Sequence, residues 1–160
     1  LMIVDLMRND LSRVCVPGSV HTEKFLRVEH HPRVHQLVST VTGALRDDCD
    51  VFDAIEACFP GGSMTGAPKR RAIQLLAELE HAPRGLYSGC FGWLDDAGDA
   101  ELAMSIRCVE LRWRDGEQIA LIGAGGGVTA DSAAQAELAE KQLKARALLS
   151  AIDSLDNEYS

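Results

Sequence analysis

The fold is decided by residues 87–122, which read YSGCFGWLDDAGDAELAMSIRCVELRWRDGEQIALI. Three apolar runs in this stretch predict β-strands, over residues 87–94, 100–112 and 118–122. Two polar turns separate the runs, and the second contains Asp115-Gly116, a dipeptide typical of β-hairpins. Because each hairpin reverses the chain, we expect an antiparallel meander of these strands.

The segments around this meander predict helices and further strands. Before it we expect a buried strand over residues 1–6, a short helix or turn over 7–14, strands over 20–28 and 35–45, and a helix over 51–59. A loop over 60–68 leads into a helix with Pro68 at its first position and its end near Glu80. After the meander, Ser132 and Gln135 predict a capping box for a helix to about Ile152. The predicted class is α+β, with a largely antiparallel sheet, helices packed outside it and no boundary within residues 1–160.

Composition and charge are those of an acidic globular protein. Hydrophobic residues make up 46% and charged residues 25% of the chain, and the formal net charge is −8. An acidic chain is a poor nucleic-acid binder, and the nearest basic cluster, Lys69-Arg70-Arg71, is too short for such a face. No segment reaches the roughly 20 apolar residues of a membrane helix, and no signal peptide is recognisable. The 5 cysteines form no CxxC pair, so we expect a cytoplasmic protein without a zinc site.

Two glycine-rich segments are similar to phosphate-binding loops but depart from the standard patterns. Residues 123–127 read GAGGG after a predicted strand, yet a GxGxxG pattern would need glycine where Val128 or Ala130 stands. In residues 61–69, Gly66 is followed by Ala67-Pro68-Lys69, whereas a P-loop needs Lys directly after its second glycine. Glycine N–H groups can still hold an anion such as a carboxylate. A nucleotide-binding module that uses these loops is the alternative from another functional class.

The last predicted helix places charged side chains on one face. Glu137, Glu140 and Lys144 recur at spacings of three and four residues. One interpretation is a pair of surface ion pairs, Glu137 with Lys141 and Glu140 with Lys144. The other is a site for a hard cation such as Mg²⁺, which takes one or two carboxylates and completes its shell with water and substrate oxygens.

Arg107 lies in the middle of the predicted strand over residues 100–112. A charged side chain there needs a partner, because an unpaired buried charge is costly. A structural salt bridge would satisfy it. A bidentate clamp on a substrate carboxylate would satisfy it equally well.

A series of motifs in unbroken order makes the chain resemble one enzyme family. The motifs are LMIVDLMRND (1–10), QLVSTVTG (36–43), PGGSMTGAPK (60–69), RGLYSG (84–89), SIR (105–107) and GAGGG (123–127). They are similar to those of the chorismate-utilising enzymes, which include component I of anthranilate synthase, component I of aminodeoxychorismate synthase, isochorismate synthase and salicylate synthase. The resemblance extends over almost the whole chain.

This resemblance implies a Mg²⁺-dependent amination of chorismate, with ammonia supplied by a glutamine amidotransferase that is either a separate subunit or a fused domain. Residues 61–69 are most similar to aminodeoxychorismate synthase component I, so formation of 4-amino-4-deoxychorismate, in 4-aminobenzoate and folate synthesis, is the first choice. Gln36 stands where anthranilate synthases carry a catalytic His, and His35 falls one residue early. Anthranilate synthase component I, of tryptophan synthesis, is the alternative within the family.

Residue roles follow from the same resemblance. Glu140 is the matching metal ligand, with Glu137 beside it, and the matching substrate contacts are Ser63, Tyr87, Arg107, Gly125, Gly126, Gly127 and Lys144. The family's other metal-binding Glu and its proposed nucleophilic Lys have no counterpart here, because they match positions upstream of Leu1. The resemblance therefore implies the C-terminal portion of a catalytic domain, which carries part of an active site and is inactive by itself.

Overall fold

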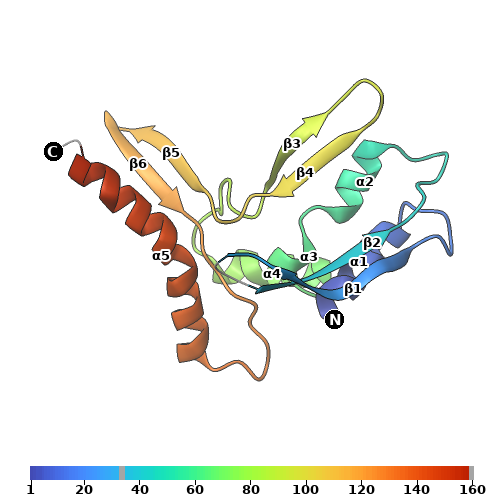
Figure 1. Ribbon diagram of the computed structural model, residues 1–160, viewed down its shortest axis with the longest axis horizontal. Helices are drawn as coiled ribbons and strands as arrows, with labels where there is room; N and C mark the ends of the chain where they lie inside the picture. Colours follow the sequence, from blue (N-terminus) through green and yellow to red (C-terminus); the bar gives the residue numbers. More distant parts are fainter. Residues whose placement is uncertain (33–34, 159–160) are drawn as a thin grey trace. The chain divides into compact units, whose positions relative to one another are not determined.

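The computed structural model describes residues 1–32 and 35–158. Two compact units divide the chain: Leu1–Leu76 with Asp95–Ala100, and Ala77–Leu94 with Glu101–Ser160. The elements in chain order are α1 (Met2–Ser12), β1 (His21–His30), β2 (His35–Thr42), α2 (Val51–Cys58), α3 (Gly62–Thr65), α4 (Lys69–Leu79), β3 (Cys90–Leu94), β4 (Ala100–Met104), β5 (Val109–Arg114), β6 (Glu117–Ile122) and α5 (Ala134–Glu158) (Figure 1). In the described part of the chain, no helix combines the length and the apolar content needed to cross a membrane.

The structure confirms the α+β class, since its strands pair as two-stranded ribbons, β1 with β2, β3 with β4 and β5 with β6. The first and last pairs are antiparallel, and the arrows of β3 and β4 also run in opposite directions (Figure 1). The expected continuous meander is wrong in one respect. Residues 100–112 form two strands, β4 and β5, because Arg107 between them has a φ of 53°, which lies outside the extended region that a ladder needs.

The predicted strand over residues 1–6 is also wrong, because this segment belongs to helix α1. A short apolar run is compatible with either a buried strand or a buried helix, and periodicity within six residues does not separate them. The burial pattern over the longer segment does separate them. Val4, Met7, Leu11 and Val14 are buried or half-buried at spacings of three and four, which is the period of a helix.

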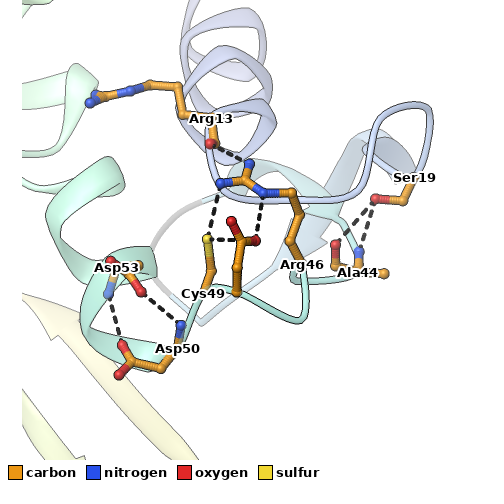
Figure 2. Close-up of polar contacts among 8 residues, drawn as sticks. Arg13, Ser19, Ala44, Arg46, Cys49, Asp50 and Asp53 are labelled. Atoms are coloured by element: carbon orange, nitrogen blue, oxygen red, sulfur yellow. Dashed lines mark hydrogen bonds and ion pairs between the residues drawn. The ribbon is translucent and has the colours of Figure 1, made fainter.

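The first unit contains a small apolar core and, beside it, a hydrogen-bonded cluster around a single arginine, Arg46. Val14, Cys15 and Ala57 form the buried core. Beside it, Arg46 donates hydrogen bonds to Arg13 O (2.7 Å), Asp48 Oδ1 (3.0 Å) and Cys49 Sγ (3.1 Å) (Figure 2). The guanidinium thereby joins the segment between β2 and α2 to the residue that follows α1.

The charge of Arg46 acts on its neighbours. Its hydrogen bond holds the pKa of the Asp48 carboxyl below the usual range. Burial raises the pKa of the Cys49 thiol, although the Arg46 cation opposes that shift.

Local signals account for the boundaries of several helices. At α2, the Asp50 carboxylate accepts hydrogen bonds from Phe52 N and Asp53 N, and the Asp53 side chain accepts one from Asp50 N (Figure 2). Helix α4 begins directly after Pro68 and ends one residue before Glu80, close to the prediction. The capping box predicted for the last helix is wrong, because α5 begins at Ala134 and Ser132 therefore lies one residue before the N-cap position.

Candidate functional site

The second unit brings together the glycine segment after β6, helix α5 and the segments that carry Tyr87 and Arg107. Helix α5 contacts the β5–β6 ribbon along β6, and residues 123–133 connect the two (Figure 1). The predicted site residues of this unit other than Gly127 are linked by a chain of close approaches. Ser63 lies in α3 of the first unit, so its convergence with them stays a prediction.

Glu137 uses its two carboxylate oxygens differently. Oε1 accepts a hydrogen bond of 2.7 Å from the Ser132 hydroxyl. Oε2 is buried and has no hydrogen-bond partner within the described residues. A Cβ placed on Gly126 would lie 3.0 Å from Oε2, so the Glu137 carboxylate lies close to the glycine segment. A buried acceptor without a partner costs roughly 1–3 kcal/mol, and more when the group is charged. A cation or a hydrogen-bond donor bound at Oε2 would remove this cost.

Lys144 and Glu140 form the i,i+4 ion pair that their spacing predicts. The Lys144 ammonium also donates a hydrogen bond of 3.2 Å to Gly125 O, which attaches the glycine segment to α5. The second pair expected from spacing, Glu137 with Lys141, is not present among the described residues. The charges on α5 are therefore more than a solvated surface, because Glu137 is engaged inward and Lys144 contacts the backbone beside it.

Arg107 is held against the same helix by a different contact. Its Nη1 donates a hydrogen bond of 2.9 Å to Lys144 O. The expected position within a strand is wrong, since the residue lies between β4 and β5 with a left-handed backbone. No salt bridge to Arg107 is found in the described part of the chain, and a guanidinium has five N–H donors, so most of them are available to a ligand.

Tyr87 packs against the glycine segment. A Cβ on Gly123 would lie 2.1 Å from the Tyr87 ring, and one on Gly125 would lie 3.1 Å from the Tyr87 hydroxyl. Gly123 is therefore a site residue that the sequence reasoning missed, although a glycine directly after a strand was a signal for a close approach. At Gly127 a Cβ would meet nothing within 4 Å, so the structure gives no steric reason for that glycine.

Two backbone hydrogen bonds bring the Tyr87 and Arg107 segments together. Ser88 N donates to Ser105 O at 2.9 Å, and Ser105 N donates to Gly89 O at 2.8 Å. Ser88 has a left-handed backbone, and its hydroxyl accepts a bond of 3.1 Å from Arg84. Ser105 is almost fully buried, and no sequence signal identified it as part of this support.

In the first unit, Lys69 is a structural residue rather than the phosphate ligand of a P-loop. Its ammonium donates to Asp10 Oδ2 at 2.7 Å, to Cys58 O at 3.2 Å and to Ala57 O at 3.4 Å. The contact thus satisfies carbonyls at the C-terminal end of α2, where a cation is favoured. A lysine at the first position of α4, where a cation opposes the helix dipole, was the signal that it serves another element.

The residues that can hold a metal in the described segments are limited. No group of three or more His, Cys, Asp or Glu side chains lies close enough together there to bind an ion. Glu137 and Glu140 approach one point from α5, since a Cβ on Gly126 would lie 3.0 Å from Glu137 Oε2 and 3.9 Å from Glu140 Oε1. Two carboxylates are the donor set that Mg²⁺ commonly takes from a protein when substrate oxygens and water supply the rest.

Comparisons with known proteins identify the family of the chain. The sequence model of the family described as "chorismate binding enzyme" matches residues 1–150. The chain is 49% identical over 152 residues to anthranilate synthase component 1 of Mycolicibacterium smegmatis, which covers 95% of this chain and 28% of that protein. It is 47% identical over 152 residues to the chloroplastic aminodeoxychorismate synthase of Arabidopsis thaliana, which covers 95% of this chain and 16% of that protein. The chain therefore spans less than a third of the length of these relatives.

A solved structure supports the fold directly. The crystal structure of anthranilate synthase component I from Streptococcus pneumoniae superimposes with a TM-score of 0.76 at 38% sequence identity. The match covers 91% of this chain and 32% of that one.

Proposed function

Since the chain belongs to the chorismate binding enzyme family, we propose that the full-length gene product aminates chorismate in a Mg²⁺-dependent reaction. The observation that carries this proposal is the cluster in the second unit. There Arg107 and Lys144 provide cations, and Glu137 and Glu140 provide carboxylates. The glycine segment accepts a hydrogen bond from Lys144 and lies beside both of these glutamates. This is the donor set that a dicarboxylate substrate and a divalent cation would use together.

Chorismate carries two carboxylates, and this chain has suitable partners for them. The Arg107 guanidinium offers a planar fork that matches a carboxylate in two-point geometry. Lys144 would exchange its ion pair with Glu140 for a substrate carboxylate, while Gly125 O continues to position the ammonium. The Tyr87 hydroxyl and the N–H groups of Gly125, Gly126 and Gly127 are further hydrogen-bond donors, and Ser63 would add its hydroxyl.

The α5 carboxylates fit a bound Mg²⁺. Within the part of the chain that the structure describes, Glu137 Oε2 is buried without a hydrogen-bond partner, and Glu140 approaches the same glycine from the same face of the helix. When bound, the ion would neutralise substrate charge and act as a Lewis acid and a template. Oxygen ligands and a carboxylate pair are what this hard cation prefers.

The ring position that receives the amine is the finer part of the proposal. The relatives support anthranilate as the first candidate product, since several of the most similar proteins are anthranilate synthase component 1. The second candidate, 4-amino-4-deoxychorismate, is supported by Gln36 in place of the expected His, by the Ser63-Met64 form of the glycine loop and by plant relatives at 47% and 49% identity. In either case the amine would come as ammonia from a glutamine amidotransferase.

The test is a product assay on the full-length gene product with chorismate, ammonium and Mg²⁺. Chromatography separates anthranilate from aminodeoxychorismate, and omission of Mg²⁺ should abolish both. Arg107→Gln should lower kcat/KM by about 30-fold or more, because the loss of a charged partner costs roughly 2 kcal/mol or more.

The matched control is Arg112→Gln, whose half-exposed guanidinium pairs with Glu110 on β5, and it should retain activity. Absence of any aminated product, together with calorimetric binding of ATP or NAD, would replace the proposal with the nucleotide-binding alternative.

A further inference from the structure

We propose that Ser132 is a positioning residue that fixes the Glu137 carboxylate so that only its Oε2 is presented to a divalent cation. The inference rests on the proposed function, because it concerns the cation that this function requires. It goes beyond that function by assigning a role to a residue outside the carboxylate pair.

The first support is the hydrogen bonding of Ser132. Its hydroxyl donates to Glu137 Oε1 at 2.7 Å and accepts from Thr129 N at 3.0 Å. The Ser132 N–H in turn donates to Thr129 O at 3.1 Å, so a closed turn over 129–132 holds the hydroxyl in place. Because an ionised carboxylate can only accept, the single proton of the Ser132 hydroxyl goes to Glu137, and the Thr129 hydroxyl at 3.4 Å can donate to Ser132 Oγ in turn.

The second support is the unequal state of the two Glu137 oxygens. Oε1 is satisfied, whereas Oε2 is buried and unpartnered among the described residues. A Cβ at Gly126 would lie 3.0 Å from Oε2, so this oxygen faces the glycine segment. The Ser132 hydroxyl therefore holds one oxygen of the carboxylate, and the other faces Gly126 and is left for a ligand.

The position of the Glu140 carboxylate explains why the orientation of Glu137 matters for cation binding. Glu140 Oε1 approaches the same point at Gly126 as Glu137 Oε2 does. A cation that uses both residues needs Glu137 in this rotamer, because a different rotamer would move its unbonded oxygen away from Gly126 and from Glu140. Hydrogen-bonding partners behind metal ligands typically change metal affinity by about 10- to 100-fold.

The experiment measures cation binding without turnover. Mn²⁺ serves as the probe, and its binding to the full-length gene product is followed by electron paramagnetic resonance in the absence of chorismate. Ser132→Ala removes the hydroxyl and should raise the Kd for Mn²⁺ by about 10- to 100-fold. Ser132→Thr keeps a hydroxyl and should bind Mn²⁺ with a Kd within about 3-fold of the original protein, on the same reasoning.

Ser154→Ala is the matched control. Its hydroxyl lies on α5, the helix that carries Glu137, but donates to Ala151 O, a contact within the helix itself. The control should leave the Kd unchanged, and melting curves for all variants should show whether each one is folded.

An unchanged Mn²⁺ affinity in Ser132→Ala would overturn the inference and leave the proposed function intact. Equal loss in the Ala and Thr variants would also overturn it, since the hydroxyl would then not be the cause. Failure of the original protein to bind Mn²⁺ and to aminate chorismate would remove the proposed function itself.

Discussion

The ion pair between Lys69 and Asp10 gives the strongest expectation about stability. The Asp10 side chain is only 3% exposed and that of Lys69 is 15% exposed, with 2.7 Å between Nζ and Oδ2. Lys69→Met keeps most of the side chain's apolar stem but leaves Asp10 buried without its cation. Removal of one partner from a buried pair costs about 3–5 kcal/mol, so we expect the free energy of unfolding to fall by that amount.

A second variant separates the uncompensated charge from the other losses. Asp10→Asn combined with Lys69→Met replaces the buried carboxylate by a neutral amide, and it should recover part of the stability lost in Lys69→Met alone. Recovery will be incomplete because the carbonyls of Ala57 and Cys58 also lose a donor. Asp10→Asn alone completes a double-mutant cycle with these two variants, and the cycle gives the free energy of interaction between Asp10 and Lys69.

Arg8→Gln is the control for an ordinary surface pair. Arg8 and Asp5 are 52% and 57% exposed with 3.4 Å between their atoms, so this change should cost less than about 1 kcal/mol. Urea unfolding followed by circular dichroism measures all these variants. A loss of less than about 1 kcal/mol for Lys69→Met, equal to that of Arg8→Gln, would refute the reasoning that the buried carboxylate depends on its cation.

Two further outcomes are expected. The hydrogen bond from Arg84 lowers the pKa of the Glu80 carboxyl in the folded protein below its ordinary value of 4.5. This pair therefore contributes its full stability above pH 4.5, and the contribution is lost as the pH falls through the lowered pKa of the folded state. Glu80→Gln should therefore flatten the acid side of the urea-midpoint curve, and an unchanged curve would contradict the assignment. Gly123→Ala places a Cβ 2.1 Å from the Tyr87 ring and should destabilise by about 1–3 kcal/mol while raising KM for chorismate, whereas Gly127→Ala should do neither to the same degree.

The sequence predicted the elements whose signals are local. Apolar residues at helical spacing over residues 51–59 identified α2, and Asp115-Gly116 identified the turn between β5 and β6. Three local predictions failed: the strand over residues 1–6, the continuous strand over 100–112 and the capping box at Ser132, which lies one residue before the N-cap position of α5. The apolar run at residues 1–6 is too short to show its period, and the interruption at Arg107 depends on a single backbone angle that no pattern encodes.

Some contacts of the candidate site could likewise be predicted from local spacing, and others could not. Spacing along α5 was enough to place Glu137, Glu140 and Lys144 on one face, and the ion pair of the last two is present. The bond from Ser132 to Glu137 depends on a rotamer and on the turn before the helix, and neither has a sequence pattern. The contact of Lys69 with Asp10 joins residues 59 positions apart, so it could not be predicted without the fold.

At position 107 the backbone conformation and the side-chain hydrogen bond favour different residue types. A left-handed backbone suits glycine and costs other residues roughly 1–2 kcal/mol, whereas the hydrogen bond to Lys144 O is donated by the Arg107 guanidinium, which glycine lacks. A selection for thermal tolerance alone would favour glycine there and would discard the attachment to α5 in the same step. Engineering of this chain for robustness should therefore exclude position 107 from the substitutions it samples.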